Sequence, residues 1–392
     1  MKLRKILSVI MSAAVILSAT ALSPVTASNN ADASLPALNN YLLEKDQNYI
    51  RGDYTNDSVT DIFDLTHLRQ PQKQPPVTGG TPVAQHGKLS VKGPDLVDKN
   101  GQKFQLYGAS THGIAWYPQY INFDSFKTQR ENWNTNVIRI AMYTAEKDGY
   151  CSGGNRDYLK GLVKNGVDYA TQLGMYVIID WHVLNDNPGD KSMNGNPNTF
   201  KEDAKAFFRE MSQLYKNNEN VLYEICNEPN GGGVSWDTVK QYANEVIPVI
   251  RENDPKAVIL VGTPTWSQDI HMAQQSPLNF DNIMYVLHFY AATHKDALRS
   301  RLESCVSGGL PVFVSEFAMC DASGNGGNDF GSGQQWMDLI KRYNLSFCSW
   351  NLGNKAESSC IFTAGNGNTS NWNDGDYTEW GKWIVNYFKN NK

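Results

Sequence analysis

The chain has 392 residues, a formal net charge of −5 and 41% hydrophobic residues, enough for one large core and a smaller appendage. Its lysines and arginines are scattered, so no basic patch of the kind that binds nucleic acid is present. Most of the ten tryptophans and nineteen tyrosines are expected in the core. Several, however, fall in predicted loops at strand ends, where core packing explains them less well.

The first 28 residues have the pattern of a secretory signal. Basic residues within positions 2–5 precede an apolar stretch from 6 to about 22, and Val25-Thr26-Ala27 offers small residues for cleavage. The stretch is short for a membrane span, and no later run approaches that length. We therefore expect a secreted, extracellular protein whose mature form has no membrane partner.

Residues 29–69 are expected to form a small helical module. Within it, residues 53–64 place oxygen side chains at positions 1, 3, 5, 9 and 12 of a twelve-residue loop, a pattern that suits calcium. The segment resembles one repeat of a dockerin, the calcium module that docks enzymes onto scaffolds, and this implies a cohesin-type partner. Ser58 replaces the usual turn glycine, and a second intact loop is missing; the alternative is a solvated acidic helix cap. The candidate calcium ligands are Asp53, Asp57, Asp61 and Asp64.

Residues 70–87 are rich in proline, glutamine, glycine and threonine, which is typical of a semi-extended linker. In the remaining domain, residues 88–392, strand-like and helix-like patterns alternate. The predicted strands are Phe104–Tyr107, Asn136–Ala141, Met175–Trp181, Val221–Cys226, Val258–Val261, Ile283–His288, Pro311–Glu316 and Ser346–Trp350. The predicted helices include Tyr158–Leu173, Phe200–Tyr215, Trp236–Asn253, Lys295–Ser307, Gly333–Tyr343 and Tyr377–Lys389.

Eight strands that alternate with helices predict an α/β fold, the (β/α)8 TIM barrel. A doubly wound open sheet is the alternative, but no Gly-x-Gly-x-x-Gly follows the first strand. Six cysteines in an exported chain permit disulfides without requiring them. Cys226, Cys320 and Cys348 lie in or beside apolar strands, where we expect buried free thiols.

Two glutamates stand at the ends of predicted strands. Glu228, in Asn227-Glu228-Pro229, follows the apolar run 221–226, and Glu316 follows the run 311–314. Parallel barrel strands deliver their carboxyl ends to one face, so these side chains are expected to meet there. Hydrolysis of a glycosidic bond needs such a pair, because the leaving oxygen is protonated while a carboxylate attacks or orients water. A simple strand-to-loop turn is the alternative for an isolated Asn-Glu-Pro.

Further polar and aromatic residues mark the other strand ends. Arg139 lies inside an apolar run, an unusual place for a guanidinium unless it is paired. Asp180-Trp181-His182, His288-Phe289-Tyr290 and Ser349-Trp350-Asn351 end the third, sixth and eighth strands, and residues 108–116 follow the first. In this order the motifs resemble glycoside hydrolase family five, most closely its bacterial endo-β-1,4-glucanase (cellulase) branch, over about residues 88–390.

The resemblance implies a retaining mechanism in which two glutamates act about 5 Å apart. Glu228 would be the general acid/base and Glu316 the nucleophile. Arg139 beside Glu316 would keep the nucleophile ionised, and Tyr290 would donate to the same carboxylate. Asn227 would bind the 2-hydroxyl of the sugar.

The resemblance also implies an outer set of substrate contacts. His182, His112 and His288 match positions that bind sugar hydroxyls or orient the carboxylates. Trp350 matches a tryptophan beneath the sugar at the cleavage point, with a cis peptide bond to Asn351 expected. The remaining implied contacts are the stacking residues Trp116 and Trp266, the lining residue Tyr143, and the polar pair Lys355 and Glu357.

The sequence therefore predicts a secreted retaining endo-β-1,4-glucanase that hydrolyses cellulose and related β-glucans. No cofactor is expected for catalysis, and no metal in the barrel, because two carboxylates carry the chemistry and no His-Glu-x-x-His occurs. A β-mannanase or mixed-linkage β-glucanase on the same site is the nearest alternative. A non-catalytic carbohydrate-binding scaffold component is another, but it predicts the loss of a catalytic carboxylate, and both are present.

Overall fold

The structure, a computed structural model, describes residues 80–185 and 194–391. The chain divides into two units, Met1–Gln74 and Pro75–Lys392, and the description concerns the second. The predicted signal segment, the calcium loop and most of the linker lie outside the described residues. Within the described residues, no helix combines the length and apolar character that a membrane crossing requires.

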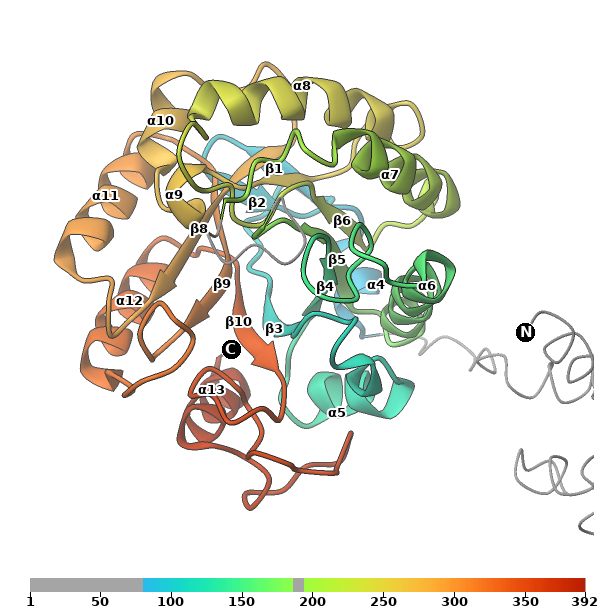
Figure 1. Cartoon of the computed structure of the whole chain (residues 1–392). Helices are drawn as coiled ribbons and strands as arrows, with labels where there is room; N and C mark the ends of the chain where they lie inside the picture. The colour runs from blue at the N-terminus through green and yellow to red at the C-terminus, as the bar shows by residue number, and fades with distance from the viewer. Residues whose placement is uncertain (1–79, 186–193, 392) are drawn as a thin grey trace, which may run out of the picture. The chain divides into compact units, whose positions relative to one another are not determined.

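Eight parallel strands close into a barrel in the order β10-β3-β4-β5-β6-β7-β8-β9, with helices around the outside (Figure 1). The strands are β3 (Tyr107–Thr111), β4 (Val137–Tyr143), β5 (Tyr176–His182), β6 (Val221–Glu224), β7 (Ile259–Val261), β8 (Ile283–Tyr290), β9 (Val312–Ala318) and β10 (Phe347–Leu352). The main surrounding helices are α5 (Phe123–Glu131), α6 (Arg156–Gln172), α7 (Lys201–Tyr215), α8 (Trp236–Arg251), α11 (Asp296–Ser307), α12 (Phe330–Arg342) and α13 (Glu379–Asn390). The predicted (β/α)8 barrel is confirmed.

The local sequence explains these elements. Strands β4, β5, β8 and β9 are buried along their whole length, as expected for near-continuous apolar runs between barrel interior and outer helices. Helix α8 is capped at its start by Ser235, whose hydroxyl accepts the Thr238 N–H, while the Thr238 hydroxyl accepts the Ser235 N–H. This reciprocal cap satisfies backbone donors that the first helical turn leaves free.

The first barrel strand was predicted too early, at Phe104–Tyr107, whereas β3 spans Tyr107–Thr111. Its residues 108–111 are Gly, Ala, Ser and Thr, and the small residues among them have little intrinsic preference for strands. The barrel needs small residues there: a Cβ on Gly108 would lie 1.9 Å from the Val137 carbonyl oxygen. Close packing between β3 and β4 therefore overrides strand propensity.

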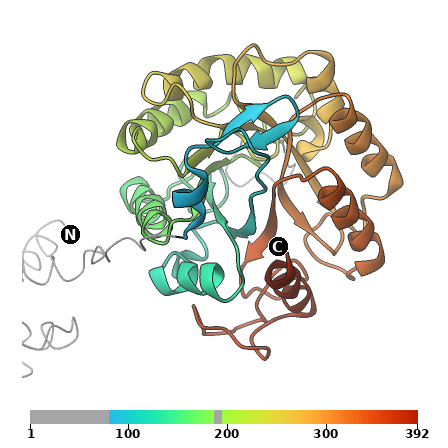
Figure 2. The same cartoon turned by 180° about the vertical axis from the view of Figure 1, so that it is seen from behind.

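An antiparallel hairpin of β1 (Ser90–Lys92) and β2 (Asp95–Val97), which was not predicted, covers the amino-terminal end of the barrel (Figure 2). Leu89 and Leu96 beside it join an apolar cluster formed with inward-facing strand residues. That cluster includes Leu106, Val137, Tyr176, Ile178, Leu222, Leu260, Val286 and Phe313. The interior of the barrel is therefore filled by side chains at this amino-terminal end.

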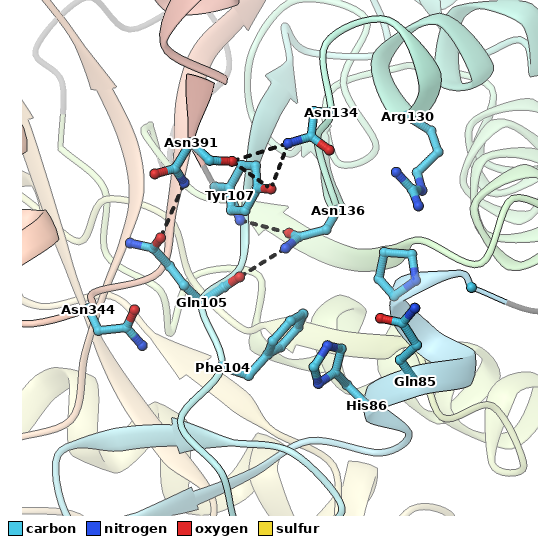
Figure 3. A pocket seen from close by; sticks show the side chains of 12 residues that line it. Gln85, His86, Phe104, Gln105, Tyr107, Arg130, Asn134, Asn136, Asn344 and Asn391 are labelled. Atoms are coloured by element: carbon cyan, nitrogen blue, oxygen red, sulfur yellow. Dashed lines mark hydrogen bonds between the residues drawn. The ribbon is translucent and has the colours of Figure 1, made fainter. Parts of the chain in front are cut away.

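A polar pocket of about 320 Å³ also lies at this amino-terminal end (Figure 3). The Asn391 carbonyl, just after α13, accepts hydrogen bonds from the Asn134 amide at 3.1 Å and the Tyr107 hydroxyl at 3.3 Å. The Asn391 amide in turn donates to Gln105 at 3.3 Å. These contacts fasten the last helix to the start of β3 and β4, which is a structural role at the stability face of the barrel.

All six cysteines are free thiols. Cys226, Cys320 and Cys348 are buried, as predicted, and so are Cys305 and Cys360. Burial raises the pKa of Cys320 to about 12, so this thiol stays protonated and unreactive at neutral pH.

Candidate active site

Apart from Arg139, which lies within β4, the predicted site residues lie at or beyond the carboxyl ends of the strands. Glu228 lies in the loop after β6, and Glu316 lies on β9. The Glu228 N–H donates to the Val183 carbonyl at 2.9 Å, and the Asn230 amide donates to the Glu228 carbonyl at 2.7 Å. The Ser267 hydroxyl holds the Asn227 carbonyl at 2.6 Å. The loop that carries Glu228 is therefore fixed to its neighbours on both sides.

A change of register in β9 turns Glu316 toward the barrel axis. Val286 on β8 pairs with Phe313, but His288, two residues later, pairs with Glu316. The additional residue in β9 has the effect of a β-bulge, which re-aims side chains. As a result the consecutive residues Ser315 and Glu316 both make contacts inside the barrel.

Glu228 and Glu316 face each other closely. One carboxylate oxygen of each lies within 4.8 Å of the other. Retaining glycosidases place their two carboxyl groups about 5 Å apart, whereas inverting enzymes need about 6.5–9.5 Å to admit a water molecule. The separation in this structure matches the retaining geometry.

The surroundings of the two carboxylates differ. Glu316 accepts hydrogen bonds from the Tyr290 hydroxyl at 2.7 Å and from Arg139 Nη1 at 3.4 Å. Burial raises the pKa of Glu316, but Arg139 and Tyr290 oppose that rise. Burial and the nearby charge of Glu316 raise the pKa of Glu228 well above its ordinary value. Arg139 and Tyr290 therefore favour the ionised form of Glu316, whereas burial and the neighbouring carboxylate favour the protonated form of Glu228.

Arg139 is paired, as the sequence led us to expect, but Glu316 is not its principal partner. Its Nε and Nη2 donate to both oxygens of Glu224 at 2.8 and 3.0 Å. Nη2 also lies 2.7 Å from Asn227 Oδ1 and 3.0 Å from Asp180 Oδ2. The guanidinium therefore sits at the centre of a buried polar layer, and its contact with Glu316 is the longest of these.

Sequence reasoning missed the roles of Glu224, Asp180 and Ser315 in this layer. A signal was available, because each is a polar residue two positions after an inward-facing apolar residue: Leu222, Ile178 and Phe313, respectively. A strand alternates its faces with a period of two, so these polar side chains face the barrel interior.

His182 connects this layer to Asn227. The Asn227 amide nitrogen, 3.2 Å from His182 Nε2, is a donor, since Asn227 Oδ1 is taken by Arg139. His182 Nε2 therefore accepts, and Nδ1–H donates to Asp180 at 2.7 Å. Burial lowers the pKa of His182 to about 3, which keeps the ring neutral. Burial raises the pKa of Asp180 to about 7, against the effect of Arg139.

His288, on β8, links the loop that carries Glu228 to strand β9. Its Nδ1 lies 2.8 Å from Glu228 Oε1, and its Nε2 lies 2.9 Å from the Ser315 hydroxyl. Burial lowers the pKa of His288 well below its ordinary value, so this ring is also neutral. Its position agrees with the predicted role of orienting a carboxylate.

His112, Tyr143 and Trp116 form one wall of the site. His112 Nδ1 accepts the Gly113 N–H at 2.8 Å and lies 3.0 Å from the Tyr143 hydroxyl. Trp116 meets Tyr143 edge-on at 5.0 Å and is 41% exposed, with its indole N–H donated to the Lys147 carbonyl. An exposed indole held in place by its neighbours offers a flat apolar face to a ligand.

Trp350 forms the floor beside this wall. Its ring stacks on His182 at 5.3 Å and is 7% exposed. The Trp350–Asn351 peptide bond is cis, as predicted. Lys355 and Glu357, in the loop after β10, form an ion pair with each other. Burial lowers the pKa of His112 to about 3, and the charge of Lys355 adds a smaller effect in the same direction.

Trp266 lies on another side, in α9 (Pro264–Ser267), and is 37% exposed. Thr265, Trp266 and Ser267 all have left-handed backbone angles, with φ of 58°, 53° and 55°. Each such non-glycine residue costs roughly 1–2 kcal/mol. The Trp266 N–H donates to the Pro229 carbonyl at 3.2 Å, so the strained turn is attached to the loop that carries Glu228.

Glu228, His288 and Glu316 are also the one group among the described residues with atoms close enough to share a metal ion. Hydrogen bonds already engage these atoms: Tyr290 and Arg139 donate to Glu316, and His288 contacts Glu228. The guanidinium of Arg139 and the Tyr290 hydroxyl stabilise negative charge on Glu316 without a metal ion. A metal-free mechanism stays our prediction.

Comparison with known proteins gives consistent matches. The family described as Cellulase (glycosyl hydrolase family 5) matches residues 97–356. Endoglucanase A of Butyrivibrio fibrisolvens is 48% identical over 303 residues, 76% of this chain and 68% of the relative. An endoglucanase of Clostridium saccharobutylicum is 47% identical over 298 residues, 76% of this chain and 64% of the relative. This chain thus spans about two thirds of these relatives.

Among solved structures, the catalytic domain of Thermobifida fusca endoglucanase Cel5A (E5), in a variant bound to cellotetraose, superposes with a TM-score of 0.71. It is 36% identical in sequence, and the match covers 79% of this chain and all of that domain. The likeness therefore extends over the whole barrel.

Proposed function

The chain belongs to the cellulase family, glycosyl hydrolase family 5, and we propose that it is a retaining endo-β-1,4-glucanase. The observation that carries the mechanism is the close pairing of Glu228 and Glu316. Negative charge is stabilised more strongly on Glu316, through Arg139 and Tyr290, than on Glu228. The relatives named endoglucanases support the substrate class.

In the first step, Glu316 attacks the anomeric carbon while Glu228 gives its proton to the glycosidic oxygen. The leaving sugar departs and an ester joins the glycosyl unit to Glu316. Tyr290 and Arg139 hold the attacking carboxylate in position through the hydrogen bonds described above. Asn227, whose amide is oriented by Arg139 and His182, is placed to bind the 2-hydroxyl.

In the second step, Glu228 takes a proton from water, which attacks the same carbon and releases Glu316. Esterification has by then removed the negative charge of Glu316. Because that charge raises the pKa of Glu228, its loss lowers this pKa and makes the carboxylate available as a base. One pair of carboxylates thus serves both steps, and the product keeps the β configuration.

The positions of the exposed tryptophans favour cleavage within a chain. Trp116 follows β3 and Trp266 lies in the segment after β7, and these strands are opposite each other in the closed order of eight. A glucan that contacts both rings must cross the barrel mouth, with sugar units on either side of the glutamates. Apolar faces of glucose rings suit stacking on indole.

Hydrolysis of cellohexaose by the purified chain, with mannohexaose as the paired substrate, tests this function. We expect cellohexaose to be cut internally, giving cellobiose, cellotriose and cellotetraose before glucose, and mannohexaose to be cut at least tenfold more slowly. Product lengths are measured by anion-exchange chromatography. Preferential cleavage of mannohexaose would move the assignment to a β-mannanase, and binding without turnover would contradict the enzymatic assignment.

Export through residues 1–28, calcium binding by residues 53–64 and docking to a cohesin-type scaffold rest on the sequence alone. These segments lie outside the described residues. They stay predictions and do not enter the mechanism.

A further inference from the structure

A continuous chain of hydrogen bonds runs from Arg139 to the acid/base residue. Arg139 donates to both oxygens of Glu224 at 2.8 and 3.0 Å. The Ser315 hydroxyl donates to Glu224 Oε1 at 2.8 Å, and His288 Nε2 lies 2.9 Å from that hydroxyl. His288 Nδ1 then reaches Glu228 Oε1 at 2.8 Å. All five side chains are buried.

The direction of each bond in this chain follows from its charged end. Burial raises the pKa of Glu224 and Arg139 opposes the rise. Because the guanidinium donates to both of its oxygens, Glu224 is an ionised acceptor, and the single Ser315 hydroxyl proton points toward it. The Ser315 oxygen is then free only to accept, so His288 Nε2 must carry a proton.

The proton on Nε2 also determines what the Nδ1 side of the imidazole can do. His288 is neutral, so a proton on Nε2 leaves an unprotonated lone pair on Nδ1. Glu228 Oε1 faces this lone pair at 2.8 Å. A carboxylate there would meet a second acceptor, whereas a protonated carboxyl group donates a hydrogen bond to it. His182 shows the opposite tautomer, with Nδ1–H donated to Asp180 and Nε2 accepting.

We propose that Ser315 is a positioning residue that transmits the charge of Glu224 to His288 and so holds the catalytic proton on Glu228. This inference rests on the proposed function for the role of Glu228. The proposal also explains what the register shift in β9 achieves. The shift allows Ser315 to face Glu224 and His288 while the next residue, Glu316, faces the substrate.

This series of hydrogen bonds from Arg139 to Glu228 acts in both steps of the reaction. Before the first step it keeps Glu228 protonated, as an acid must be. After that proton has moved to the leaving oxygen, the Glu228 carboxylate faces the His288 lone pair and draws a proton from the incoming water more strongly. The other charged or titratable groups that act on Glu228 and His288 are Glu316, Arg139, Asp180, Glu224, His182, His294 and Tyr290.

The tautomer of His288 is measurable without substrate. In the full chain labelled with ¹⁵N-histidine, we expect the NMR spectrum to show His288 protonated at Nε2 and His182 protonated at Nδ1. Signals are assigned from the spectra of His288→Gln and His182→Gln variants. A neutral His288 protonated at Nδ1 would overturn the proposal, and so would a doubly protonated ring at neutral pH.

The pH profile of kcat/KM on cellohexaose, a neutral substrate, gives a second measurement. In Ser315→Ala, His288 is free to carry its proton on Nδ1 and donate to the Glu228 carboxylate, which lowers the pKa of Glu228. Activity requires protonated Glu228 and is lost as the pH rises through that pKa. We therefore expect the alkaline limb to move down by about one pH unit, with the acid limb little changed.

Two variants separate this effect from structural damage. Ser315→Thr keeps a hydroxyl and should restore the alkaline limb. Ser349→Ala is the matched control, because Ser349 is a buried serine on the adjacent strand β10 whose hydroxyl makes no hydrogen bond with any residue that the structure describes. It should leave both limbs in place. An unchanged alkaline limb in Ser315→Ala, or an equal shift in Ser349→Ala, would overturn the proposal. The NMR measurement contains no substrate, so it tests the tautomer of His288 independently of whether the enzyme cleaves cellohexaose.

Discussion

Replacing the nucleophile in Glu316→Ala is expected to reduce kcat on cellohexaose by about 10⁴-fold or more. The variant has no carboxylate to form the glycosyl ester, and Arg139 and Tyr290 lose the group to which they donate. Steady-state rates at the optimum pH of the unaltered enzyme provide the first measurement, with thermal unfolding to show that the barrel is intact.

Chemical rescue makes this prediction specific to a nucleophile. With 2,4-dinitrophenyl β-cellobioside, whose leaving group needs no proton, azide can enter the space vacated by Glu316 and attack from the same face. The expected product is the α-cellobiosyl azide, identified by NMR. A β-configured azide, or retention of more than a tenth of the original activity without azide, would show that Glu316 is not the nucleophile.

Removing the acid/base in Glu228→Ala is expected to have a different pattern of loss. On cellohexaose the rate should fall by about 10²–10⁴-fold, because the sugar leaving group requires a proton. On 2,4-dinitrophenyl β-cellobioside the first step needs no acid, so a burst of dinitrophenol should precede slow turnover. The contrast between the two substrates, measured in one enzyme preparation, serves as the internal control.

Azide again distinguishes the roles. In Glu228→Ala it should attack the glycosyl ester from the face where water normally enters and release the β-cellobiosyl azide, with faster turnover. The variant should also lose the alkaline limb of its pH profile, since the group that must stay protonated is gone. Equal losses on both substrates, or an α-configured azide, would contradict the assignment of Glu228.

The fold was predictable because buried parallel strands leave a strong signal. Runs such as 175–181 and 283–288 are apolar enough to be found without knowledge of their neighbours. The first strand was misplaced because β3 is made of small residues whose selection depends on the closeness of β4, and that contact is tertiary. The β1–β2 hairpin was missed for the same reason: Leu89 and Leu96 acquire their partners only when the barrel closes.

The site was predictable to the extent that its residues stand at strand ends. Glu228, Glu316 and the three histidines all follow apolar runs, and closure of the barrel brings these ends together. The sequence pointed to a partner for Arg139 but did not identify Glu224, which lies 85 residues away along the chain. Such pairing inside the barrel depends on strand register, and the register shift between β8 and β9 was not predicted from the sequence.

The most direct test of the whole account is the configuration of the first product. Cellohexaose hydrolysis in deuterated buffer, followed by proton NMR before mutarotation, reports the anomer released at the new reducing end. Two glutamates whose oxygens lie within 4.8 Å predict a double displacement, and so the β-anomer should appear first. Initial release of the α-anomer would contradict the mechanism and require a water molecule between the two carboxylates.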